Sequence, residues 1–140
     1  MGHVPDLRLG VHPDLLAKID RVLAAMTIVG HPMRIVQGVR TAEAQHALWL
    51  QGRELPGRRV TNADGYQRKS NHQVKADGFG WAVDCCFTTG EPFGETQPWD
   101  LYGLLGKTVG LVWGGDWVSL RDRPHLELPM TTEGPPGTPG

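Results

Sequence analysis

Two histidines and two aspartates lie in segments whose composition could support metal-dependent hydrolysis. His72 lies in a polar, glycine-rich stretch, Asp84 interrupts the apolar run WAVDCCF, and His125 opens the segment HLEL. Two imidazoles and one carboxylate form a ligand set for a catalytic zinc that keeps a position open for water. The metal makes that water acidic, and a further carboxylate must accept its proton. His72, Asp84 and His125 could be the ligands. Asp122, just upstream of His125, could be the base.

Polar residues project from two segments that otherwise resemble buried strands. Side chains alternate along a strand, so Asp84 and Cys86 share one face, and His125 and Glu127 share another. A carboxylate on an apolar strand is costly to bury unless it is paired. Taken singly, Asp84 could be a buried acid that pairs with an arginine, and His125 could be a hydrogen-bonded histidine of the core. Two such polar faces in one short chain favour a functional site.

Hydrophobic patterning indicates which elements must position these residues. The sequence predicts helices at 13–26, 42–50 and 99–109, and strands at 33–39, 81–87, 111–113 and 124–128. Pro13 suits a first helical turn, Thr41 is a predicted N-cap, and Gly103 and Gly106 interrupt the third helix. Helices and strands do not alternate regularly. The predicted fold class is therefore α+β, with a small antiparallel sheet flanked by helices.

Length and composition indicate one loop-rich domain. The chain has 140 residues, with 19 glycines and 11 prolines, which predicts a single domain at 1–130 and a disordered tail at 131–140. The polar stretch from 51 to 80 is too long for an ordinary connection, and such loops are usually functional.

Charge and cysteine content narrow the possible partners and compartments. The net charge is −1, so there is no basic excess for nucleic acid, and no stretch is apolar enough to cross a bilayer. The N-terminal segment lacks the apolar core of an export signal. Cys85 and Cys86 are adjacent, which excludes a disulfide framework and favours a reducing cytoplasm. We expect a monomer with no nucleic-acid partner and no membrane insertion.

Three separated segments resemble the LAS metallopeptidases, the group of lysostaphin, D-alanyl-D-alanine peptidases and hedgehog-type domains. SNH followed by GWAVD resembles the SxHxxGxAxD motif, and WGGDW followed by RDRPHLEL resembles the segment with the catalytic acid and last ligand. QGVRTAEAQ followed by LWLQGR resembles the upstream strand and helix. The segments occur in the family's order across roughly 35–128. The segments resemble those of VanY-like carboxypeptidases and small phage endolysins in particular, which implies a D-Ala-D-Ala-peptidase-like fold.

The resemblance assigns one zinc ion to His72, Asp84 and His125, with Asp122 as general base and later general acid. One departure concerns spacing. The family motif places the aspartate seven positions after the histidine, whereas here the separation is twelve, with about five residues inserted in QVKADGF. Asp77 lies in that insert and is an alternative ligand. Asp84 is preferred because it keeps the GxAxD context and a strand to orient it.

Other roles follow from the same resemblance. Arg40 matches the arginine that polarises the scissile carbonyl or holds a substrate carboxylate. Ser70 matches the motif's serine and is expected near the substrate. Glu127 matches the acid of the family's PHxE ending and would orient His125. Asp116 is an alternative base, although an acid between glycine and tryptophan in a turn is more often a turn residue.

The expected function is zinc-dependent hydrolysis of peptidoglycan stem peptides. We expect a phage endolysin that cleaves the L-Ala–D-Glu bond, stays in the host cytoplasm until lysis and then acts on the wall from the periplasm. A D-alanyl-D-alanine carboxypeptidase is the first alternative. A non-catalytic, zinc-stabilised wall-binding module is the second, and retention of Asp122 argues against it.

Overall fold

The computed structural model describes residues 6–130, and its elements follow the predicted order. The helices are α1 (Pro13–Ile28), α2 (Ala42–Leu50) and α3 (Trp99–Thr108), and a 3-10 turn, η1, covers Gly114–Asp116. The strands are β1 (Met33–Gln37), β2 (Ala82–Phe87), β3 (Val112–Trp113) and β4 (His125–Glu127). The predicted helices and strands are all present, with ends shifted by one or two residues. The predicted disordered tail at 131–140 lies outside the described residues.

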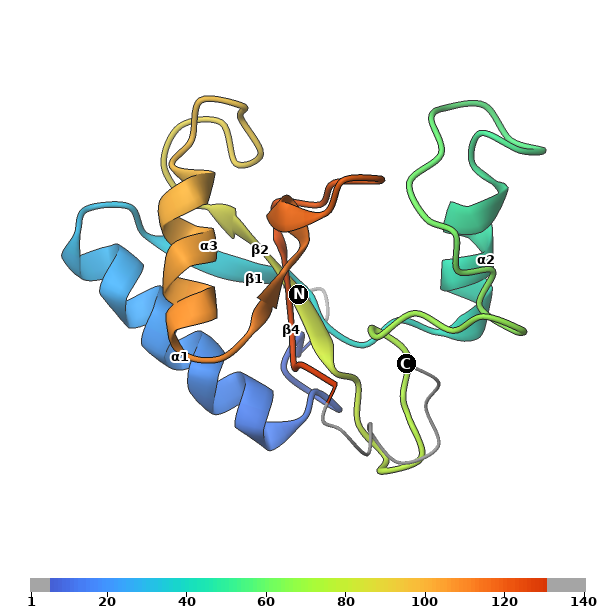
Figure 1. Cartoon of the computed structure of the whole chain (residues 1–140), viewed down its shortest axis with the longest axis horizontal. Helices are drawn as coiled ribbons and strands as arrows, with labels where there is room; N and C mark the ends of the chain where they lie inside the picture. Colours follow the sequence, from blue (N-terminus) through green and yellow to red (C-terminus); the bar gives the residue numbers. More distant parts are fainter. Residues whose placement is uncertain (1–5, 131–140) are drawn as a thin grey trace, which may run out of the picture.

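The four strands form one antiparallel sheet in the order β1-β2-β4-β3. Helices α1 and α3 pack against each other on one side of this sheet (Figure 1). The α+β prediction is confirmed. The sheet is not covered evenly, however, because α2 lies well apart from the other two helices.

The core lies between the sheet and α1 and α3. Leu15, Ile19 and Met26 of α1 recur at helical spacing and are fully buried, as are Val83 and Phe87 of β2. Each such side chain contributes about 1.5–3 kcal/mol on burial. Because Val83 and Phe87 point into this core, strand alternation turns the intervening Asp84 toward the opposite face.

The glycines of α3 are packing residues. The predicted interruption of the helix at Gly103 and Gly106 is wrong, since α3 is continuous through both. A Cβ at Gly103 would overlap the indole of Trp113, and a Cβ at Gly106 would lie 2.5 Å from Leu126. The absence of these side chains lets α3 approach the sheet next to β4, which carries His125.

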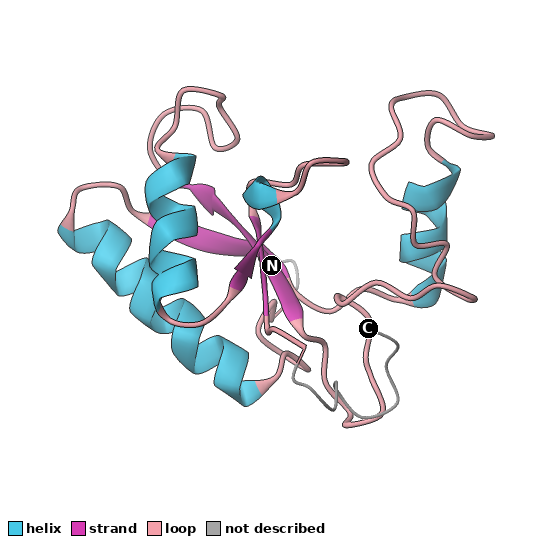
Figure 2. Ribbon diagram, viewed as in Figure 1, coloured by secondary structure: helices cyan, strands magenta, loops and turns pink. Residues whose placement is uncertain are grey.

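Helix α2 belongs with the polar stretch that follows it. Thr41 caps the helix, because its Oγ1 accepts from the backbone N–H of Ala44. Gln45, the buried residue of α2, donates through Nε2 to the Ala63 carbonyl and to Thr61 Oγ1. Figure 2 shows the long irregular segment between α2 and β2 beside this helix. Helix α2 thus anchors a loop rather than extending the main core.

Across residues 6–130, the helices are all too short or too polar to pass through a bilayer.

Candidate active site and metal centre

A row of polar residues crosses the sheet on the face turned away from α1 and α3. Asp84 on β2 pairs in register with Gln37 on β1 and with His125 on β4. A β-bulge between Ile35 and Gln37 shifts the β1 register, and it is this shift that brings Gln37 opposite Asp84.

His72 reaches the same point from the loop before β2. Its backbone carbonyl accepts from Arg40 N–H, and its own N–H donates to Ser70 Oγ at 3.1 Å. The neighbouring Asn71 carbonyl accepts from the N–H of Trp81, at the start of β2. These backbone contacts bind the loop to the sheet and place a 3% exposed His72 side chain beside Asp84.

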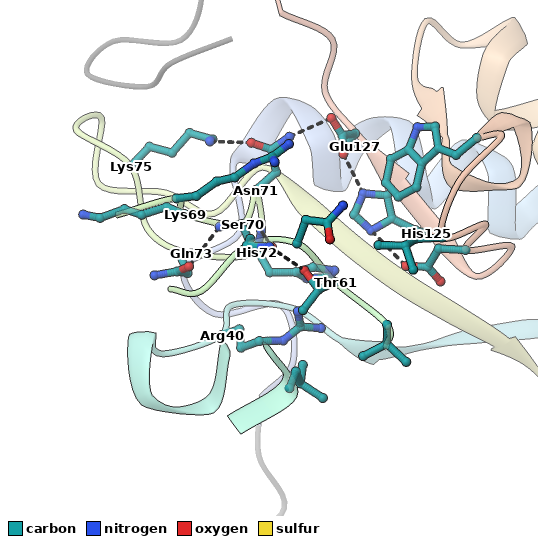
Figure 3. Close-up of a pocket in the computed structure, with 18 of the residues that line it drawn as sticks. Arg40, Thr61, Lys69, Ser70, Asn71, His72, Gln73, Lys75, His125 and Glu127 are labelled. Carbon is teal, nitrogen blue, oxygen red and sulfur yellow. Dashed lines mark hydrogen bonds and ion pairs between the residues drawn. The ribbon is translucent and has the colours of Figure 1, made fainter. Parts of the chain in front are cut away.

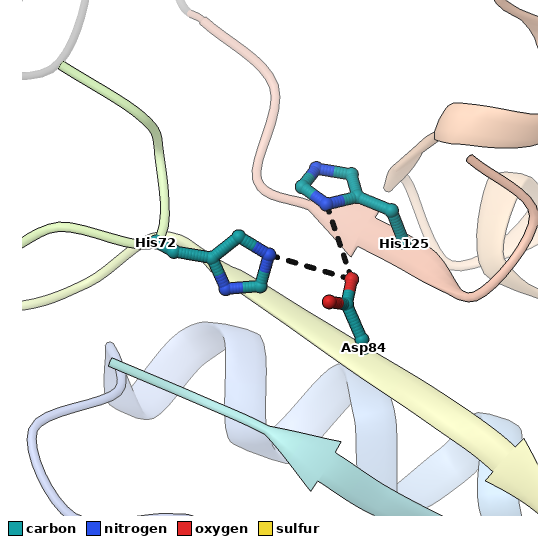
Figure 4. A group of neighbouring side chains, drawn as sticks. All are labelled: His72, Asp84 and His125. Atoms are coloured by element: carbon teal, nitrogen blue, oxygen red, sulfur yellow. Dashed lines mark ion pairs between the residues drawn. The ribbon is translucent and has the colours of Figure 1, made fainter. Parts of the chain in front are cut away.

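The three predicted ligands converge on one point (Figure 4). Asp84 Oδ1 lies 3.3 Å from His72 Nε2 and 3.3 Å from His125 Nδ1. One ligand atom from each residue lies within 4.8 Å of the others, which is close enough to share a metal ion.

Hydrogen bonds on the far side of each imidazole orient the inner nitrogens toward the centre. His72 Nδ1 lies 2.9 Å from the Gly38 carbonyl, and His125 Nε2 lies 2.6 Å from Glu127 Oε1. Both oxygens are acceptors, so each outer nitrogen must donate. When each imidazole is neutral, its inner nitrogen is thereby left as a lone-pair donor for a metal, an arrangement typical of metal-ligating histidines.

Unsatisfied atoms at this point also fit a cation. His72 Nε2 and Asp84 Oδ1 are buried and, among the described residues, have no hydrogen-bond partner. A neutral His72 that donates through Nδ1 presents a lone pair at Nε2, and Asp84 presents another. Two facing acceptors are unfavourable unless a cation lies between them. The donor set of two imidazoles and a carboxylate suits zinc.

Opposite charges on Asp84 and His125 stabilise each other. Burial raises the pKa of Asp84, but electrostatic attraction from the neighbouring His125 and His72 imidazoles holds this pKa well below its usual value. Burial lowers the pKa of His125, but interactions with Asp84 and Glu127 outweigh this effect and raise the pKa to about 9. The carboxylate is therefore ionised. A metal bound by these residues would have to displace a proton from His125, as is general for histidine ligands.

Asp77, the alternative ligand, lies elsewhere. Its Oδ2 accepts from Trp81 Nε1 at 2.7 Å, and its Oδ1 accepts from Phe79 N–H. Its carboxylate also lies 3.8 Å from His12 Nε2, at the start of α1. Asp77 closes the turn of the insert, and the geometry favours Asp84 as the third ligand.

Asp122 lies at the entrance to the three-residue centre. Its Oδ2 is 3.7 Å from His125 Nδ1, and 42% of its side chain is exposed. Partial burial, followed by repulsion from Asp84, raises its pKa above the usual value, which suits a group that must accept a proton. Asp116 instead pairs with Lys107 Nζ at 2.9 Å on the surface.

Arg40 extends into the site from the segment between β1 and α2. Its Nη1 donates to Gln45 Oε1 at 2.7 Å, its Nη2 donates to Gln37 Oε1, and Nη2 lies 3.8 Å from Asp84 Oδ2. Its Nε is buried and unpaired within the described structure. Burial lowers its pKa, and attraction from Asp84 and Asp122 offsets part of this. The guanidinium is thus a positioned cation beside the centre.

Two further predicted residues have structural partners here. Ser70 lines the cavity, and its Oγ accepts from His72 N–H, so it shapes the loop that carries this ligand. Glu127 accepts from His125 through Oε1 and from Asn71 Nδ2 through Oε2 at 2.7 Å. Glu127 therefore orients His125, as the shared strand face predicted.

A wide cavity of about 1190 Å³ contains the site (Figure 3). One wall comes from 60–63 and 67–76, and the other comprises Trp117, Ser119, Leu120 and Asp122. Sequence reasoning missed Asn71 and Lys75, which line the cavity. Asn71 occupies the variable position of the SxH motif, and Lys75 lies outside the motif residues. The signal that could have indicated Lys75 is its position in the insert.

Comparisons with known proteins identify the family. The model of the D-alanyl-D-alanine carboxypeptidase family matches residues 64–128, which include His72, Asp84 and His125. The peptidoglycan L-alanyl-D-glutamate endopeptidase CwlK of Bacillus subtilis is 31% identical over 126 residues, covering 84% of this chain and 73% of CwlK. The chain belongs to this peptidase family. It is a metallopeptidase that acts on peptidoglycan peptides.

Solved structures agree with this family fold. The L-Ala D-Glu endopeptidase ChiX of Serratia marcescens is 25% identical with a TM-score of 0.57, covering 86% of this chain and 81% of ChiX. DacB of Streptococcus pneumoniae is 20% identical with a TM-score of 0.61, covering 89% of this chain and 69% of DacB. The predicted D-Ala-D-Ala-peptidase-like fold of this family member is confirmed.

The first prediction concerns metal binding by this peptidase. Purified protein should bind about one zinc ion, and Asp84→Ala should abolish most of that binding, because Asp84 Oδ1 lies between both imidazoles. Asp77→Ala is the matched control and should keep full occupancy, since Asp77 binds Trp81 instead. Zinc content by elemental analysis measures both. Loss of zinc in the Asp77 variant alone would show that Asp77, and not Asp84, is the third ligand.

Proposed function

We propose that this peptidase is a zinc-dependent endopeptidase that cleaves the L-Ala–D-Glu bond of peptidoglycan stem peptides. The observation that carries the hydrolase chemistry is the convergence of His72, Asp84 and His125 at a wide cavity that His72, His125 and Asp122 line. The choice of bond is supported by CwlK and ChiX, both named as L-alanyl-D-glutamate endopeptidases.

His72 Nε2, an Asp84 carboxylate oxygen and His125 Nδ1 would hold the zinc. When bound there, zinc would supply Lewis acidity toward the carbonyl and lower the pKa of a coordinated water. The chain contributes the rigidity of the centre. Gly38 and Glu127 hold the two imidazoles from outside, so the inner nitrogens need no reorientation.

Asp122 and Arg40 perform the remaining steps. The Asp122 carboxylate, with its raised pKa, accepts a proton from the attacking water and passes it to the leaving amine. Arg40 places positive charge beside the centre, where the carbonyl oxygen becomes negative in the transition state. Gln45 and Gln37 hold its guanidinium in advance, so little reorganisation is needed.

The form of the cavity favours internal cleavage. An endopeptidase must accept peptide on both sides of the scissile bond, and the cavity exceeds the volume of about 300–1,000 Å³ usual for a small-molecule site. A carboxypeptidase needs a cation beside the centre for the terminal carboxylate, whereas Arg40, the cation next to Asp84, is already held by two glutamines. D-alanyl-D-alanine carboxypeptidase activity is the second candidate, favoured by the matching family model.

We also propose a role in host lysis as a phage endolysin, held in the host cytoplasm until a membrane lesion opens. The support is the resemblance of its three motif segments to small phage endolysins. Expression in Escherichia coli together with a membrane-permeabilising protein should clear the culture, whereas expression alone should not. An Asp122→Asn variant is the control and should not lyse cells under either condition. Equal clearing by wild type and variant would contradict this role.

Asp122→Asn separates the base from the ligands. The amide is nearly isosteric but cannot accept a proton, so turnover should fall about a thousandfold while zinc content and melting temperature stay unchanged. Asp116→Asn is the control and should keep near wild-type turnover, because Asp116 pairs with Lys107 outside the cavity. Hydrolysis rates on purified peptidoglycan measure both. The reverse pattern would make Asp116 the base.

The scissile bond is tested by mass spectrometry of fragments from Gram-negative peptidoglycan. Internal cleavage should release peptides that begin with a new D-Glu amine. Free D-Ala as the sole product would instead establish carboxypeptidase activity. Zinc binding with no product would favour the wall-binding module.

A further inference from the structure

Lys75 is a cation of the cavity wall that the chemistry above does not use. It lies in the insert that lengthens the spacing between His72 and Asp84, and it lines the cavity. The insert folds back on itself, with Lys75 N–H donating to the Phe79 carbonyl and Gly78 N–H donating to the Lys75 carbonyl. Asp77 fastens this turn to Trp81. The insert is therefore an ordered hairpin that presents Lys75 to the cavity.

A hydrogen-bonded chain links Lys75 to the metal centre. Its Nζ donates to Asn71 Oδ1 at 2.5 Å, Asn71 Nδ2 donates to Glu127, and Glu127 accepts from His125. Figure 3 shows Lys75, Asn71 and Glu127 in sequence along the upper cavity wall. The ammonium is thus held at a defined place on the wall of the cavity that His72 and His125 also line.

The charge of Lys75 has no carboxylate partner within ion-pair distance in residues 6–130. Both oxygens of Glu127 are taken by His125 and Asn71, and Asp77 is bound to Trp81. The ammonium has three donors, of which Asn71 uses one. It is also partly desolvated, because burial lowers its pKa against attraction from Glu127 and Asp77. A positioned, half-buried cation with free donors suits an anionic ligand.

Other cations on this wall are less suited to such a role. Arg68 and Lys69 also line the cavity, but both side chains are exposed, so water screens their charges. Arg40 is held by Gln45 and Gln37.

We propose that Lys75 is a specificity-determining residue that binds a carboxylate of the stem peptide on the leaving-group side of the scissile bond. This inference rests on the proposed L-Ala–D-Glu cleavage. Two carboxylates branch from the stem beyond that bond, ahead of the carboxylate at its C-terminal D-Ala, and these two are the candidates. In peptidoglycan, D-Glu is linked through its γ-carboxyl and keeps a free α-carboxylate, and diaminopimelate carries a second one. Both offer the same chemistry to an ammonium.

Three synthetic pentapeptides distinguish these sources. The first is L-Ala-γ-D-Glu-diaminopimelate-D-Ala-D-Ala, the second has the D-Glu α-carboxyl amidated, and the third has L-Lys in place of diaminopimelate. Wild-type kcat/KM should fall about tenfold or more on the peptide that lacks the recognised carboxylate, as expected for a partly desolvated charge-assisted contact. The Lys75→Met variant should lose that preference, because its kcat/KM should fall only on the peptides that keep the recognised carboxylate. Lys75→Arg should restore part of it.

Lys69→Met is the charge-matched control and should keep the wild-type preference. If wild type treats all three peptides alike, or if Lys75→Met slows all three equally, Lys75 acts only through Asn71 and the proposal is overturned. Fragment masses report the cleaved bond independently of these ratios. Cleavage between the D-Ala residues would refute the proposed bond and the leaving-group position of the carboxylate, and the three rates would then show only whether Lys75 recognises one of these carboxylates on the acyl side.

Discussion

The burial of the Asp84 carboxylate is the constraint on which the rest of this structure depends. An ionised carboxylate on a central strand, inside the fold, costs several kcal/mol unless other groups compensate its charge. Here two imidazoles and the Arg40 guanidinium surround it. Each of these groups is in turn held from outside, by Gly38, by Glu127 and by two glutamines. The result is a set of inward-facing donors that a zinc ion would complete.

Two regions of the fold position the site residues. The sheet with α1 and α3 supplies a rigid apolar core, and it fixes Asp84 and His125 in register on neighbouring strands. Helix α2 with the polar stretch after it supplies the loop that carries His72 and much of the cavity wall. Gln45 joins the regions, because it holds both Arg40 and the Ala63 backbone. Catalytic residues placed on strands keep their geometry, while the loop can vary to suit different substrates.

This division fits the range of activities within the family. The family model is that of a D-alanyl-D-alanine carboxypeptidase, while CwlK and ChiX are named as L-alanyl-D-glutamate endopeptidases. A shared centre for amide hydrolysis is compatible with different bonds, because the walls of the cavity choose the substrate. In this chain the hairpin around Lys75 adds to one wall without moving Asp84 away from His72. The inserted residues therefore alter the surface offered to substrate rather than the centre.

Sequence alone predicted the elements and the candidate residues of the site. Hydrophobic spacing predicted α1, Thr41 predicted the start of α2, and alternation along β2 and β4 predicted which faces carry Asp84, His125 and Glu127. These features are local, so neighbouring residues suffice to reveal them. Spacing could not choose decisively between Asp84 and Asp77, because the inserted residues change the interval to His72.

The tertiary structure decided what depends on contacts between distant segments. The fold places the Asp77 carboxylate against Trp81 and His12. It also places Gly103 against Trp113 and Gly106 against Leu126, where a larger side chain would not fit. It also joined Lys75 to Glu127 through Asn71, across more than fifty residues of sequence. No periodicity or motif encodes such pairings, because they arise only when the loop before β2 folds against β4, the strand that carries His125 and Glu127.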